Sequence, residues 1–112
     1  MRSARTKAVD ITEKTKEIVH ERDNHCCIFC GVSVDQTFAN AHIIPRSRGG
    51  LGIPENIITA CAWCHNDFDQ TGRRAKMMET VYDHMVIHYP TLYKVRDYWF
   101  LKGRLTYDKD RK

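Results

Sequence analysis

Residues 41–65 read AHIIPRSRGGLGIPENIITACAWCH, and this stretch decides the fold. It sets a histidine in an apolar run, then a basic Gly-rich turn, an asparagine, a second apolar run and a cysteine pair followed by a histidine. The apolar runs at 38–44 and 57–60 predict two short strands, and Pro45 ends the first because proline lacks a backbone donor. Residues 62–70 predict a helix. Two strands and a helix therefore surround a common centre.

The composition predicts one small globular domain spanning residues 1–112. Hydrophobic residues make up 42% of the chain and charged residues 29%, which are globular values. A membrane span needs about 18 consecutive apolar residues, and no apolar run in the sequence approaches that length. The charged N-terminus lacks the apolar core of a secretory signal. The sequence therefore predicts no membrane association. The net charge of +4 is compatible with a nucleic-acid partner but does not require one.

Four of the five cysteines form two Cys-x-x-Cys pairs, Cys27 with Cys30 and Cys61 with Cys64. In a chain without a secretory signal, such pairs indicate metal binding rather than disulfides. Together they predict a closed four-cysteine site for a structural Zn²⁺ ion. Each pair is expected to form a tight turn, or knuckle, around the ion. The two pairs are further apart in the sequence than in an ordinary zinc ribbon, so we expect a functional insert between the two knuckles. Cys26 is not expected to bind the ion, because Cys27 and not Cys26 matches the spacing of the second pair.

A helix is predicted before the first knuckle. Asp10 and Glu13 have the spacing of a capping box, which predicts a helix from Asp10 to about Arg22. Residues 1–9 carry little apolar content, so we expect them to be frayed and flexible.

A C-terminal helix and closing segment are predicted at residues 73–112. The apolar spacing predicts a long helix over 73–89, which Pro90 stops. The aromatic stretch 92–101 is expected to close the core, and residues 105–107 to form a last short strand.

Several polar residues have the spacing of a binding site. His65 and Asp69 are four apart on the helix predicted at 62–70, so they share one face and can converge on one ion. The guanidiniums of the Gly-rich turn suit bidentate contact with phosphate. Arg73, Arg74 and Lys76 at the start of the helix predicted over 73–89 oppose its dipole, which indicates a further phosphate contact. The candidate DNA-binding residues are Arg46, Arg48, Arg73, Arg74 and Lys76.

The order and spacing of these motifs resemble the HNH endonuclease family. The letters H, N and H in the family's name would correspond to His42, Asn56 and His65. The chain is most similar to the small phage-type members that carry a four-cysteine zinc site. The resembling region spans about residues 23–69. It implies an α+β fold with a ββα-metal (HNH, His-Me finger) core at about residues 38–70, a four-cysteine zinc knuckle pair and flanking helices.

The resemblance also implies metal-dependent hydrolysis of DNA phosphodiester bonds. His42 would be the general base that takes a proton from water, and His65 would bind the catalytic divalent ion, Mg²⁺ or another such as Mn²⁺ or Ni²⁺. Asn56 would order the loop and hold either His42 or the ion. The family often has a metal ligand directly before the base, where this chain has Ala41. Asp69 is therefore expected as the second ligand of the ion.

Two other functions stay open. The first is a catalytically weak, zinc-stabilised DNA-binding module, in which His42→Ala would change nothing. The second is a zinc-stapled protein-interaction domain, which would show no salt-dependent affinity for DNA. The family association further implies DNA as the partner, a role beside a phage terminase during genome packaging, and a location in the cytoplasm of a bacterial host.

Overall fold

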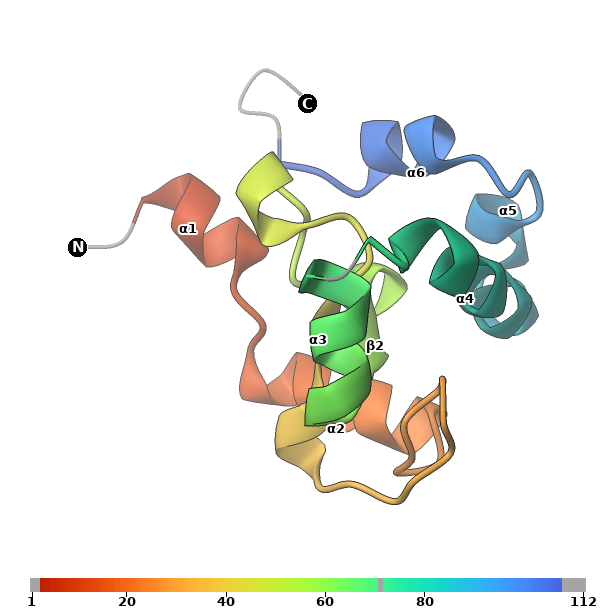
Figure 1. The fold of residues 1–112 in the computed structure, drawn as a ribbon. Coiled ribbons are helices and arrows are strands. Elements are labelled where there is room, and N and C mark those ends of the chain that lie inside the picture. Colours follow the sequence, from red (N-terminus) through yellow and green to blue (C-terminus); the bar gives the residue numbers. More distant parts are fainter. Residues whose placement is uncertain (1–2, 71, 108–112) are drawn as a thin grey trace.

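The structure is a computed structural model that describes residues 3–70 and 72–107 (Figure 1). A two-stranded hairpin lies among helices, which confirms the predicted α+β class. In chain order the elements are α1 (Ala4–Val9), α2 (Glu13–Arg22), the 3₁₀ turn η1 (Gln36–Phe38), β1 (Ala39–His42), the 3₁₀ turns η2 (Arg46–Arg48) and η3 (Pro54–Asn56), β2 (Ile57–Thr59), α3 (Ala62–Gln70), α4 (Arg74–His88), α5 (Pro90–Tyr93) and α6 (Tyr98–Arg104).

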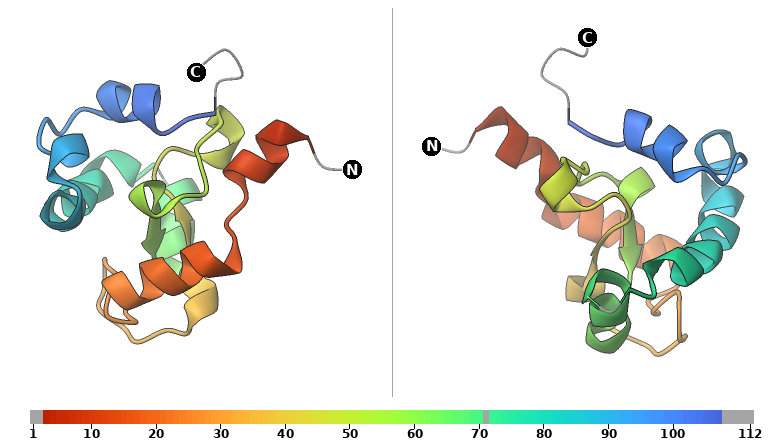
Figure 2. Two further views of the ribbon diagram at one scale, coloured as in Figure 1. Left: turned by 180° about the vertical axis from the view of Figure 1, so that it is seen from behind. Right: turned by 45° about the horizontal axis from the view of Figure 1, so that its top comes forward.

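The hairpin leads directly into α3, which gives the ββα order predicted for residues 38–70. β1 and β2 are antiparallel, with His42 opposite Ile57, and the register shifts between Ala39 and Ala41. Helix α2 packs across both strands, and Figure 2 shows that it lies on the opposite side of the hairpin from α3. The hairpin thus lies between α2 and α3.

The main core lies between the hairpin and helices α3 and α4, and α5 and α6 close it. Its largest fully buried side chains are Ile43, Ile44, Ile58, Phe68, Val81, Met85, Tyr93, Leu101 and Leu105. The prediction that residues 92–101 close the core is confirmed by Tyr93 and Leu101. Trp99 in the same stretch is 69% exposed, because α6 turns this ring toward solvent.

A buried ion network ties two helices to the hairpin. The carboxylate of Asp23 accepts hydrogen bonds from Arg22 Nε (2.7 Å) and Nη2 (2.9 Å), from His84 Nε2 (2.6 Å) and from the backbone N–H of Thr59 (2.9 Å). Burial alone would raise the pKa of Asp23, but the hydrogen bonds from His84 and Arg22 lower it to about 2. The network therefore joins the end of α2 to β2 and to α4.

The N-terminal segment differs from its prediction. Residues 4–9, expected to be frayed, form α1, because Ser3 caps its first turn and the buried Val9 anchors its end. The predicted helix start at Asp10 is wrong. Thr12 is the N-cap of α2, and its hydroxyl accepts from the backbone N–H of Thr15 at 3.1 Å, whereas Asp10 follows the end of α1.

The C-terminal half follows its prediction with two differences. The long helix ends at His88, as expected, but Pro90 also opens α5, since proline suits a first helical position. The last strand is reduced to one bridge between Gly50 and Thr106, and residues 108–112 lie outside the described residues. No helix in the described part of the chain is long and apolar enough to cross a membrane.

Candidate functional site

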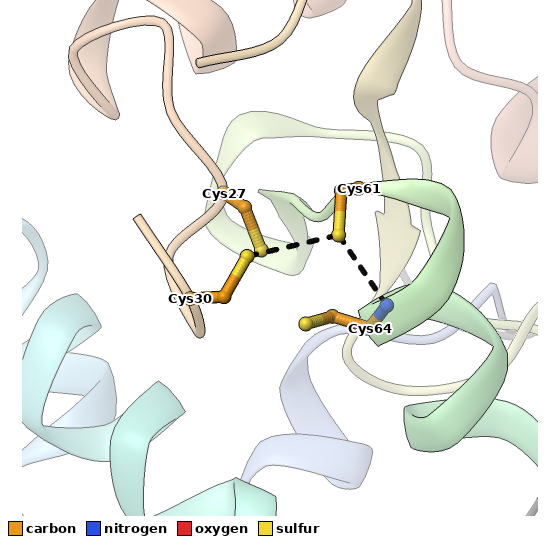
Figure 3. A group of neighbouring side chains, drawn as sticks. All are labelled: Cys27, Cys30, Cys61 and Cys64. Atoms are coloured by element: carbon orange, nitrogen blue, oxygen red, sulfur yellow. Dashed lines mark hydrogen bonds between the residues drawn. The ribbon is translucent and has the colours of Figure 1, made fainter. Parts of the chain in front are cut away.

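The four predicted cysteine ligands meet in space. The Sγ atoms of Cys27, Cys30, Cys61 and Cys64 all lie within 4.8 Å of one another, and Figure 3 shows the two pairs facing each other. The first pair comes from the turn after α2 and the second from the start of α3. Cys26 is not in this group, as its spacing predicted, and its backbone bridges to Ser33 instead.

The cysteine group fits a zinc ion. Tetrahedral Zn–S bonds of about 2.3 Å require sulfurs about 3.8 Å apart, and the sulfurs of Cys30 and Cys61 are 3.8 Å apart. The backbone N–H of Cys64 donates to Cys61 Sγ at 3.4 Å. Burial and the neighbouring sulfur of Cys61 raise the pKa of the Cys64 thiol, so four thiolates require a cation to compensate their charge. The four cysteines can thus hold a structural zinc that joins the first knuckle to α3.

A cleft lies beside the end of β1 and contains the predicted catalytic histidines. His42 reaches it from β1, and His65 and Asp69 reach it from α3. The turn η2 and residues at the start of α6 line its other walls, and its volume is about 1170 Å³. The tertiary structure therefore brings the predicted base and the predicted ion-binding pair to one place.

His42 is held in one tautomer. Its Nε2 lies 2.8 Å from the carbonyl oxygen of Val9, and a carbonyl can only accept, so Nε2 carries the proton. In the neutral ring, Nδ1 then has a free lone pair. Burial lowers the pKa of His42, the Val9 carbonyl opposes this shift, and the charge of Arg46 adds to the lowering. His42 is therefore neutral near pH 7 and able to accept a proton at Nδ1.

His65 and Asp69 form a pair one turn apart on α3, as predicted. His65 Nδ1 lies 3.3 Å from Asp69 Oδ2, and Arg74 Nη1 lies 3.1 Å from Asp69 Oδ1. In the described residues, no group of three or more His, Cys, Asp or Glu side chains gathers in this cleft. An ion held here would need further ligands of another kind.

Asn56 orders the loop between the strands. The side chain is fully buried, and its Oδ1 accepts from the backbone N–H of Ile44 at 2.8 Å. Its Nδ2 donates to the carbonyls of Ile44 (3.2 Å) and Leu51 (2.8 Å). Both amide hydrogens are thus occupied by the loop backbone. The geometry supports the loop-ordering part of the predicted role, because Asn56 fixes the chain directly after His42.

The predicted DNA-binding cations fall into three settings. Arg46 and Arg48 line the cleft, and Arg46 also pairs with Asp10. Arg73 and Lys76 line a separate depression beside Phe29 and Asp67. Arg74 also lines the cleft, but its guanidinium donates to backbone carbonyls. The DNA-binding role of all five stays a prediction, and the cleft itself contains three of them.

Arg74 links α4 to the hairpin through hydrogen bonds. Its guanidinium donates to the carbonyls of His42, Ile43 and Phe68, and it stacks on the Phe68 ring with 3.9 Å between its central carbon and the ring centroid. Because its hydrogens point into the protein, Arg74 positions β1 relative to α3. The pairing with Asp69 places its charge at the edge of the cleft.

Some residues of the cleft were not identified from the sequence. Asn40 lies two residues before His42 on β1, and strand alternation could have placed it on the same face. Lys16, Tyr98 and Trp99 also line the cleft, but they come from α2 and α6. No local pattern marks them, since only the tertiary fold brings these helices beside β1.

Residues 27–79 match the family model described as HNH endonuclease. This range contains all four cysteines of the zinc site together with His42, Asn56 and His65. This region of the chain therefore matches the HNH endonuclease family, which confirms the resemblance read from the motifs. The family is one of metal-using nucleases that act on DNA. No curated protein and no solved structure matches the chain.

Proposed function

We propose that this protein is a metal-dependent DNA endonuclease that hydrolyses phosphodiester bonds. The observation that carries the proposal is the fixed tautomer of His42. Its Nε2–H is held by the Val9 carbonyl, and its Nδ1 is free to act as a base in the cleft that also contains His65.

The proposed reaction is the attack of water on the scissile phosphorus, with departure of the 3′ oxygen. His42 takes the proton of the attacking water at Nδ1. The resulting imidazolium keeps its hydrogen bond to Val9, and the negative charge of Asp69 favours it. Asn56 keeps the loop after His42 in place, so the base does not shift during the step.

His65 and Asp69 would hold the catalytic divalent ion, Mg²⁺ or another such as Mn²⁺ or Ni²⁺. When bound, such an ion stabilises the negative charge on the phosphate and on the departing oxygen. Ala41 is fully buried and has no ligand atom, so it contributes nothing to this site. Arg46 and Arg48 on η2 line the cleft and are suited to the phosphates that flank the scissile bond.

A plasmid assay tests the proposal. Zinc-loaded protein is incubated with supercoiled plasmid, first without an added ion and then with Mg²⁺, Mn²⁺ or Ni²⁺. We expect nicked or linear DNA only with an added ion, and we expect His42→Ala to slow cutting about 100-fold or more. His88→Ala is the matched control, since His88 is exposed on α4 and is not part of the cleft. Equal cutting by native protein and His42→Ala would remove the base from its role.

The second candidate is a zinc-stabilised DNA-binding module with weak or no catalysis. The buried Ala41, in the place of a usual metal ligand, favours it. In that case, neither protein cuts but both retard DNA on a gel, with an affinity that falls as salt rises. For either function, we place the protein in a phage, beside a terminase in the cytoplasm of the bacterial host. Co-purification with the terminase from infected cells tests this setting.

A further inference from the structure

Asn40 has a polar atom that the fold does not satisfy. Its side-chain Oδ1 is buried, and among residues 3–70 and 72–107 it has no hydrogen-bond partner. The same side chain lines the cleft with His42, His65 and Asp69. An unpaired buried carbonyl oxygen costs about as much free energy as a lost hydrogen bond, so the presence of this unpaired oxygen in the folded protein needs an explanation.

The backbone explains why Asn40 faces the cleft. Neighbours on a strand point to opposite faces, and Ala39 and Ala41 are both fully buried in the core. Asn40 and His42 therefore share the other face of β1. The register shift between Ala39 and Ala41 falls at Asn40, and such irregularities re-aim a side chain next to an active site.

Two arginines of the cleft are engaged away from this oxygen. Arg46 pairs with Asp10, and Arg74 directs its guanidinium to backbone carbonyls and Asp69. Amide oxygens of asparagine are ordinary ligands of hard divalent cations. A cation held by His65 and Asp69 alone would have only two protein ligands.

We infer that Asn40 Oδ1 is a ligand of the catalytic divalent ion, together with His65 and Asp69. This inference rests on the proposed function. It gives the site one neutral oxygen from β1, and one nitrogen and one carboxylate oxygen from α3. Asn40 thereby supplies the ligand that Ala41 cannot, and it comes from the strand that carries the base. The remaining coordination positions are left to water and to the DNA phosphate.

The test is a direct measurement of Mn²⁺ binding. Zinc-loaded protein is titrated with Mn²⁺, and free Mn²⁺ is followed by its paramagnetic resonance signal, without DNA and without catalysis. We expect Asn40→Ala to weaken Mn²⁺ binding about tenfold or more, and Asn40→Asp to keep or tighten it because a carboxylate oxygen also ligates. Asn66→Ala is the matched control, since Asn66 is exposed on α3 and does not line the cleft. Its affinity for Mn²⁺ is expected to be unchanged.

The outcomes separate this inference from the proposed function. If native protein cuts plasmid and Asn40→Ala binds Mn²⁺ as tightly as native, the nuclease stands and Asn40 is not a ligand. If Asn40→Asp loses as much affinity as Asn40→Ala, the amide acts through its shape or its N–H group, and the inference also fails. If native protein neither binds Mn²⁺ nor cuts, both fail together. Circular dichroism and zinc content show whether each variant is folded.

Discussion

Replacing Asp23 by asparagine tests how much the buried ion network contributes to stability. Its carboxylate receives four donated hydrogen bonds, from Arg22, His84 and the Thr59 backbone. Asparagine has the same shape, but it is neutral, and its amide hydrogens must face at least one of these donors. The variant thus loses charge pairing and gains a donor–donor conflict inside the protein.

The pKa of Asp23 gives the magnitude. It falls from 3.8 to about 2 in the folded protein, and each pKa unit corresponds to about 1.4 kcal/mol, so the charged form gains about 2–3 kcal/mol. The side chain is fully buried, so solvent does not reduce this figure. A lowered carboxyl pKa stabilises above the unfolded value and is lost as pH falls toward 2, so the gain is complete at pH 7. With the donor conflict, we expect Asp23→Asn to lose about 3 kcal/mol of unfolding free energy, or about 12 °C in Tm.

The assay is urea unfolding at pH 7, followed by circular dichroism with zinc bound. Asp83→Asn is the control, because Asp83 forms an exposed pair with Arg96 at 2.8 Å and such pairs contribute about 1 kcal/mol or less. If Asp23→Asn is as stable as Asp83→Asn, the network is not a major source of stability and the argument from its pKa is refuted.

Three further perturbations test the base, the zinc site and the loop after β1. Burial lowers the pKa of His42, and the base must be neutral, so kcat/KM should rise with pH to a half-maximum below 6.5, and a midpoint at or above 6.5 would contradict this. Cys64→Ser, or removal of zinc by a chelator, should abolish cooperative unfolding, because structural zinc contributes on the order of 10 kcal/mol; zinc content and circular dichroism measure this, and a folded zinc-free protein would contradict it. Gly50→Ala should cost more than about 3 kcal/mol in urea unfolding, since its Cβ would lie 1.7 Å from a backbone oxygen, whereas Gly103→Ala meets nothing within 4 Å and should cost nothing.

The sequence determined the features that depend on local spacing. Two residues between the cysteines of each pair identified all four members of the cysteine group that can hold a metal ion, and left Cys26 out. The helical period placed α3 and α4 within a residue or two, and four-residue spacing on α3 predicted that His65 faces Asp69. These relations hold within one turn of chain, so they need no knowledge of the rest of the fold.

Only the tertiary structure decided how the site is held. His42 depends on the Val9 carbonyl, 33 residues away, and Asp23 depends on His84, 61 residues away. The sequence marked Arg74 as a phosphate contact, and only the fold shows that its guanidinium also donates to the carbonyls of His42 and Ile43. Such partners are not periodic in the chain. They are fixed by how helices pack on the hairpin, since a buried polar group must find its partner wherever the fold brings one.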